Sequence, residues 1–138
     1  MRVSLVDRSN YYKGLLVLIG RDRIIDKRER ELMLQLGAIL NFEKRFCEAA
    51  IADLLDNKYI TNEPIIFDER EIAECFLRDA IRLALVDKEI HSDELAWLRA
   101  IARANKFTDK WLDNESQRLQ ENKYSPDQPT YLDIRQYL

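Results

Sequence analysis

The chain has 138 residues, of which 46% are hydrophobic and 34% are charged, with only three glycines and three prolines. This composition is typical of one globular domain and disfavours a turn-rich all-β fold. The formal net charge of −3 gives no overall electrostatic basis for binding nucleic acid or an anionic membrane surface.

Neither membrane insertion nor a disulfide framework is indicated by the sequence. Residues 1–7 lack the basic and apolar blocks of a signal peptide, and the best apolar run, residues 15–19, is far too short to span a bilayer. Cys47 and Cys75 stand alone, without the C-x-x-C pairs of zinc or redox motifs. We therefore expect a cytoplasmic protein in which both cysteines are buried core thiols.

A degenerate internal repeat organises the sequence. When the chain is shifted by 65 positions, apolar residues meet apolar residues over about 40 positions, among them Leu18 with Leu83, Leu36 with Ile101, Phe42 with Phe107, Phe46 with Trp111 and Leu54 with Leu119. The repeat predicts an all-α single domain, residues 1–121, of six to seven helices in two pseudo-symmetric three-helix halves. The first copy covers about residues 9–55 and the second about residues 74–120.

Three helices are predicted in the first copy. The first runs from Ser9, as its N-cap, to about residue 20. The second opens at Asp26, because Asp26 and Glu29 have the spacing of a capping box. The third spans about residues 42–55 and is expected to bury an apolar stripe made of Phe42, Phe46, Ala49, Ala50 and Leu54.

Three further helices are predicted in the second copy. Pro64 interrupts the helical pattern between residues 57 and 67, and Asp68 then caps a long helix that reaches about Val86. The next helix starts near Ser92. Thr108 caps the last one, whose inward-facing residues are Trp111, Leu112 and Leu119.

Residues 122–138 form a proline-containing apolar tail. Pro126 and Pro129 stop the preceding helix, but the residues that follow are too apolar for a plain disordered tail. We expect this tail to pack on the chain's own helices. The alternative is a short motif that binds in a groove of another protein.

The acidic turn between the first two helices of each copy is the sharpest chemical feature. Hard divalent cations are bound by oxygen ligands that converge from a short loop. The candidate metal ligands are Asp87, Glu89, Asp93 and Glu94 in the second copy, and Asp22, Asp26 and Glu29 in the first. An EF-hand is excluded, because the sixth position counted from Asp87 is Ser92 instead of glycine and the twelfth is Leu98 instead of glutamate.

Helix capping is the alternative interpretation of these carboxylates. Acidic side chains stabilise helix N-termini by accepting hydrogen bonds from free N–H groups and by complementing the helix dipole. Asp22 and Asp87 are different, because each follows the C-terminal end of a predicted helix, where the dipole disfavours an anion. Either a cation or hydrogen bonds to the following turn can stabilise these two residues.

The sequence contains no set of residues that specifies a reaction. His91 is the only histidine, which excludes a two-histidine zinc site and leaves little for a Ser-His-Asp or Cys-His hydrolase. A glycine-rich phosphate-binding loop is also absent from the sequence. We therefore expect a protein that is not an enzyme.

The repeated acidic spacing resembles the signature of the TerB-like tellurite-resistance family. It is present as Asp22, Ile25 and Glu29 and again as Asp87, Ile90 and Glu94. The resemblance covers most of residues 9–120 and implies an all-α fold with two similar halves. It also implies an acidic patch suspected of binding metal ions, in proteins linked to tellurite and chemical-stress responses.

This chain departs from the family pattern directly after each repeated aspartate. Family members often have glycine there, whereas this sequence has Arg23 and Lys88. These cationic residues weaken a cation site, most of all in the first copy, where Arg21 and Arg23 surround Asp22. Residues 87–94 are therefore the better candidate site.

Two functional expectations follow. The first is a non-enzymatic, stress-associated TerB-like module with a divalent-cation site at the acidic turns. The second is a protein-interaction adaptor whose acidic turns are purely structural helix caps, with a protein partner bound through an apolar groove or the C-terminal tail. No nucleic-acid partner is expected, and the sequence leaves the oligomeric state open.

Overall fold

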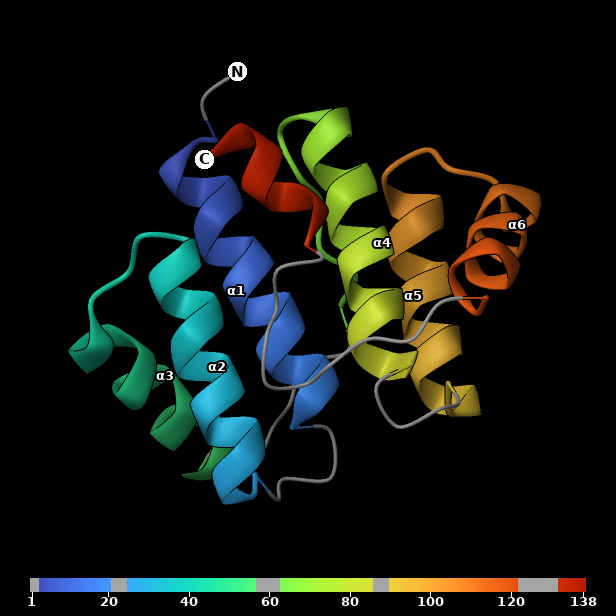
Figure 1. Ribbon diagram of the computed structural model, residues 1–138. Coiled ribbons are helices and arrows are strands. Elements are labelled where there is room, and N and C mark those ends of the chain that lie inside the picture. Colours follow the sequence, from blue (N-terminus) through green and yellow to red (C-terminus); the bar gives the residue numbers. More distant parts are fainter. Residues whose placement is uncertain (1–2, 21–24, 57–62, 86–89, 122–131) are drawn as a thin grey trace.

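The computed structural model describes residues 3–20, 25–56, 63–85, 90–121 and 132–138 (Figure 1). Within these ranges the chain forms six α-helices and one short 3-10 helix, and no strand. The elements are α1 (Leu5–Ile19), α2 (Lys27–Ile39), α3 (Lys44–Asp56), α4 (Arg70–Leu85), α5 (Ser92–Ala104), α6 (Asp109–Leu119) and η1 (Asp133–Tyr137). The prediction of an all-α single domain is confirmed.

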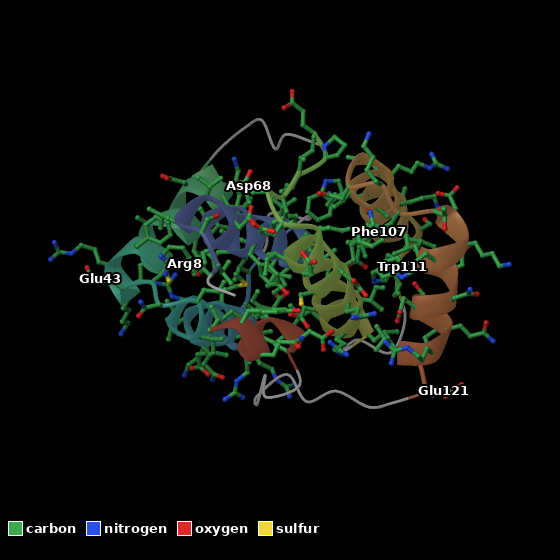
Figure 2. The ribbon with its side chains drawn as sticks, turned by 90° about the horizontal axis from the view of Figure 1, so that it is seen from above. Arg8, Glu43, Asp68, Phe107, Trp111 and Glu121 are labelled. Atoms are coloured by element: carbon green, nitrogen blue, oxygen red, sulfur yellow. The ribbon has the colours of Figure 1, made fainter. Side chains whose placement is uncertain are left out.

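Helices α1 and α4 lie side by side at the centre of the molecule (Figure 1). Helix α1 contacts α2 and α3, which also contact each other, while α4 contacts α5 and α6, which do the same. Seen from above, Arg8 of α1 therefore lies on the opposite side of the molecule from Phe107 and Trp111 (Figure 2). None of the described helices combines the length and apolar character that a membrane span requires.

One continuous hydrophobic core joins all these helices. Tyr11 and Leu15 of α1 meet Phe76 and Ile81 of α4 in this core, and each of the four side chains is fully buried. Tyr11 and Phe76 pack edge to face, with ring centroids 5.3 Å apart. Cys47 and Cys75 are buried and free, so the prediction of core thiols is confirmed.

The start of α1 differs from the prediction. The helix begins at Leu5, and its N-cap is Ser4, whose Oγ accepts a hydrogen bond from the N–H of Asp7 at 3.1 Å. The prediction of Ser9 was wrong because the apolar pattern does not extend over the first turn. Leu5 and Val6 are exposed, and the buried residue of that turn is Asp7.

The predicted caps of α2 and α6 are confirmed. In the capping box of α2, Asp26 accepts from the N–H of Glu29 at 2.8 Å, and Glu29 accepts from the N–H of Asp26 at 3.2 Å. Thr108 accepts from the N–H of Trp111 at 3.0 Å. The expected start of α5 at Ser92 is also confirmed, with His91 as its N-cap residue.

The prediction that Asp68 caps α4 was wrong. The helix begins at Arg70, and the side chain of Asp68 is exposed. The free N–H groups at this end are bound instead by Asp7 of α1, whose carboxylate accepts from Asp68 at 2.8 Å and from Glu69 at 3.2 Å. A cap that is supplied by another helix cannot be predicted from the spacing of neighbouring residues in the sequence. The expected end of α4 near Val86 lies just outside the described residues.

Helix α3 turns a different face to the core than its apolar stripe predicts. Cys47 and Ile51 are buried, whereas Phe46 is 45% exposed and Ala49 is also exposed. The rest of the predicted stripe, Phe42, Ala50 and Leu54, is only half-buried. Close packing of Cys47 on Gly37 of α2 sets this rotation, because a Cβ at Gly37 would lie 2.1 Å from the Cys47 Sγ.

Candidate functional site

The acidic turn of the first copy is occupied by helix capping. Asp26 and Glu29 bind each other's backbone N–H groups, and this reciprocal pair stabilises the N-terminus of α2. Asp22, the third candidate ligand of this copy, lies outside the described residues. The two described candidates thus have a structural role that requires no ion.

The acidic turn of the second copy is described only in part. Glu94 accepts a hydrogen bond from the N–H of His91 at 3.1 Å, and Asp93 stands in the first turn of α5. Asp87 and Glu89 lie outside the described residues. Over the described ranges, no three His, Cys, Asp or Glu side chains are grouped closely enough to hold a metal ion.

A buried charged cluster on α4 was missed by the sequence analysis. Asp79 is fully buried and accepts hydrogen bonds from the Tyr11 hydroxyl and from the N–H groups of Asp133 and Ile134, at 2.7 and 3.2 Å for the two backbone groups. Arg82 Nη1 donates to Asp79 Oδ1 at 3.0 Å and to Asp133 Oδ1 at 2.8 Å. The cluster therefore joins α1, α4 and η1.

A second arginine extends this cluster towards α6. Arg78 lies 3.5 Å from the Asp133 carboxylate and 3.2 Å from that of Glu115, and it also pairs with Glu74 one turn earlier on α4. Its guanidinium lies 5.9 Å from the ring centroid of Trp111. Asp133 is thus held between two arginines of α4.

Burial controls the protonation of this cluster. It raises the pKa of the Asp79 carboxyl from 3.8 to about 6, against the opposing effect of the hydrogen bonds from Tyr11, Asp133 and Ile134. Burial, followed by the nearby negative charge of Asp79, raises the pKa of Tyr11 well above its ordinary value. The pKa of Cys75 is raised to about 12, again mainly by burial.

The helical spacing contains the signal that could have identified Asp79. Ile72, Phe76, Asp79 and Leu83 recur at intervals of three and four residues, so Asp79 stands on the apolar face of α4. A carboxylate on such a face needs hydrogen-bond partners from elsewhere in the fold. The sequence does not say which segments supply them.

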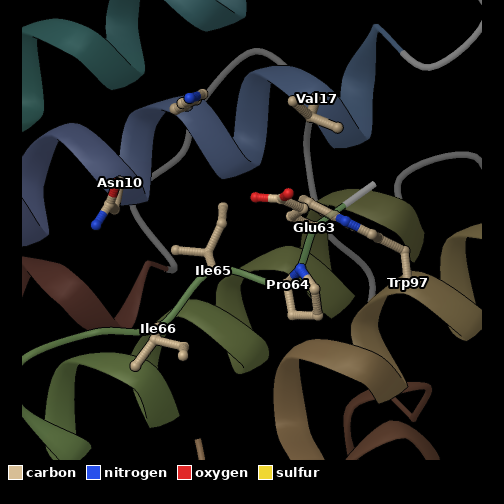
Figure 3. A pocket seen from close by; sticks show the side chains of 8 residues that line it. Asn10, Val17, Glu63, Pro64, Ile65, Ile66 and Trp97 are labelled. Atoms are coloured by element: carbon tan, nitrogen blue, oxygen red, sulfur yellow. The ribbon is translucent and has the colours of Figure 1, made fainter. Parts of the chain in front are cut away.

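A pocket of about 220 Å³ opens between α1, α5 and the segment 63–66 (Figure 3). Helix α1 contributes Asn10, Lys13 and Val17, and α5 contributes Trp97. Its described lining includes one cationic side chain, Lys13, and one carboxylate, Glu63.

Comparisons with known proteins add nothing to the sequence and structural observations above. No protein-family model, no curated protein and no solved structure matches this chain.

Proposed function

We propose that the chain is a non-enzymatic TerB-like module, built from two copies of one helix trio and associated with tellurite or chemical stress. The two trios are α1–α3 and α4–α6. Their helix limits support the duplication, because Lys27 and Ser92, which start α2 and α5, are 65 positions apart. Lys44 and Asp109, which start α3 and α6, have the same separation.

The observation that carries this proposal is a turn with the same geometry in both trios. Asn41 has a φ of 67° and Lys106, 65 positions later, has a φ of 70°. After each of these residues the next N–H bonds back to the preceding helix: Phe42 to the carbonyl of Gly37 and Phe107 to that of Ala102, both at 2.8 Å. A helix ends in this left-handed conformation at one particular residue. Two such ends separated by the same 65 positions as the helix starts therefore support a common origin of the two trios.

A divalent-cation site at residues 87–94 is the binding function we assign to this module. Glu29 and Glu94 have equivalent positions, since each accepts from the N–H of the N-cap residue of its helix. Asp87 precedes Glu94 by the same seven positions that separate Asp22 from Glu29. The second copy is preferred because it lacks the flanking arginines of the first, and hard cations require a negative oxygen-rich loop.

Cation titration tests this function. Calcium, magnesium, manganese and zinc are each added while tryptophan fluorescence and melting temperature are followed, because Trp97 lies one turn after Glu94 on α5. At about 100 times the dissociation constant, the bound ion should stabilise the fold by about 2.7 kcal/mol.

Two matched double variants locate the effect. We expect Asp87→Asn/Glu94→Gln to lose the stabilisation and Asp22→Asn/Glu29→Gln to keep it, because only the first pair belongs to the proposed cation site. The two variants are matched, since both remove equal charge and each Gln can still accept the capping hydrogen bond. The cation function is rejected if none of the four ions changes either signal, or if the Asp87→Asn/Glu94→Gln variant responds like the wild type.

A protein-interaction adaptor is the second candidate, and exposed aliphatic side chains favour it. Val6 is 58% exposed and Ile66 is 65% exposed. The hydrogen bond from Asp68 to Asp7 links the two segments that carry them. If this surface binds a protein, Val6→Ser/Ile66→Ser should weaken binding of an isolated partner without lowering the melting temperature. Unchanged binding would remove this surface from the adaptor function.

A further inference from the structure

The C-terminal segment, residues 132–138, is held on α4 in the manner of a bound peptide. Its N–H groups at Asp133 and Ile134 open the short helix η1, and both donate to the carboxylate of Asp79. An anion at this position stabilises the start of a helical turn, because it satisfies free N–H groups and complements their dipoles. Asp79 therefore recognises backbone, which any peptide of this conformation can present.

The side chain of Asp133 is recognised by charge. Arg82 Nη1 donates to its Oδ1 at 2.8 Å, and Arg78 Nη1 lies 3.5 Å from its Oδ2. Arginines around a carboxylate select an acidic residue at the first position of the turn. A peptide with an uncharged residue there would leave both arginines without this partner.

Two aliphatic anchors flank that acidic residue. Leu132 is 5% exposed and Ile134 is 1% exposed, and both belong to the core cluster. The next two residues, Arg135 and Gln136, are exposed. The site thus recognises an aliphatic–Asp–aliphatic sequence at the start of a helical turn.

The six α-helices also contact one another directly, in addition to the contacts that this segment makes. Helix α4 contacts α1, α5 and α6 as well as η1. If residues 132–138 left the site, Asp79 would keep its hydrogen bonds with the Tyr11 hydroxyl and Arg82. The buried carboxylate would therefore retain partners in an open site.

We propose that the surface of α4 around Asp79, Arg82 and Arg78 is a peptide-binding site, and that the chain's own C-terminal segment occupies it as a displaceable internal ligand. The external partner is a protein segment of the same chemistry, an acidic residue between two aliphatic residues at the start of a helical turn. The site lies on α4 and uses none of the residues assigned to the cation. A cation titration that shows no binding therefore does not count against the peptide-binding site.

The full-length chain tests this site through a variant that changes only the internal ligand. Leu132→Asp/Ile134→Asp removes both anchors and leaves α4 intact. Arg135→Asp is the matched control, because it changes the net charge equally at an exposed position of the same segment. A fluorescent peptide of residues 130–138 is added to each protein and its anisotropy is measured, with a second peptide carrying Asp133→Asn and Ile134→Ser as the specificity control.

We expect saturable binding of the native peptide to the Leu132→Asp/Ile134→Asp protein and at least about tenfold weaker binding to the wild type and to Arg135→Asp, whose sites are occupied. The altered peptide should bind none of the three proteins. Circular dichroism must show that the double variant retains its helices. The proposal is overturned if that variant unfolds, since the segment is then part of the core, or if it stays folded and does not bind the peptide.

Sedimentation of the wild-type chain separates the external partner from a second copy. We expect a monomer at all concentrations. A dimer that the Leu132→Asp/Ile134→Asp variant cannot form would identify a second copy as the occupant and overturn the external partner.

Discussion

The carboxylate of Asp7 accepts a hydrogen bond from the backbone N–H of Asp68 at 2.8 Å, and this contact joins the first turn of α1 to the start of α4. The same carboxylate accepts from Glu69 at 3.2 Å. Asp79 of α4 makes the same arrangement with the C-terminal segment, because its carboxylate accepts from the N–H groups that open η1. In both cases a buried aspartate of one helix binds the backbone N–H groups at the start of another element that packs against it.

Replacement of Asp7 by asparagine should destabilise the fold. The amide retains one acceptor oxygen, so one of the two N–H groups at the start of α4 loses its partner and the negative charge is lost. We expect the free energy of unfolding to fall by about 1–3 kcal/mol, the usual cost of an unsatisfied buried polar group. Urea unfolding measures the change, with an unaltered m-value.

Asp68→Asn is the matched control for this variant, since Asp68 is exposed and only its backbone N–H takes part in the contact. Its effect should stay within about 0.5 kcal/mol. An equal loss in the two variants would show that the loss is not specific to the carboxylate of Asp7.

The elevated pKa of Asp79 predicts a pH dependence of stability. Its pKa is about 6 in the folded chain, against 3.8 ordinarily, so the folded state binds more protons between these values. Its contribution to stability is therefore complete below pH 3.8 and is lost as the pH rises through 6. This difference in pKa corresponds to about 3 kcal/mol.

Comparison with Asp79→Asn isolates this contribution from other titrating groups. The difference in unfolding free energy, wild type minus variant, should fall by up to about 3 kcal/mol between pH 4 and pH 7. Denaturant unfolding at several pH values measures it. A difference that is constant with pH would mean that Asp79 titrates equally in the folded and unfolded chains.

Lys106→Gly should stabilise the protein. Lys106 has a φ of 70°, in the left-handed region where a Cβ is disfavoured by about 1–2 kcal/mol. Glycine avoids this strain but has more freedom in the unfolded chain, so we expect a net gain of about 0.5–1 kcal/mol in thermal or urea unfolding. Lys110→Gly, inside α6, is the contrasting control and should destabilise by up to about 1 kcal/mol.

Gly37→Ala tests the close contact between α2 and α3. The added Cβ would lie 2.1 Å from the Cys47 Sγ, so the sulfur or the helices must shift, and overpacking of this kind costs about 1–3 kcal/mol. Cys47→Ala removes the clashing sulfur and should recover part of the loss in the double variant. Simple additivity of the two single losses would show that the two residues do not interact.

The sequence predicted well those features that depend on neighbouring residues. The capping box of Asp26 and Glu29 and the N-cap Thr108 were predicted from local spacing, because each is formed between residues three positions apart. Ser9 was wrong as the start of α1 because its real cap, Ser4, precedes two exposed aliphatic residues that hide the helical pattern. Of the candidate metal ligands, the sequence placed Asp26, Glu29 and Glu94 correctly at helix starts.

The sequence by itself determined the all-α class and most helix positions, because helical periodicity and caps are local properties of the chain. Only the tertiary structure decided which elements Asp7 and Asp79 cap and which face of α3 is buried. These outcomes join residues more than fifty positions apart or depend on contact between two helices. A buried carboxylate must be satisfied by whichever backbone the fold brings to it, and that pairing is fixed by packing in three dimensions.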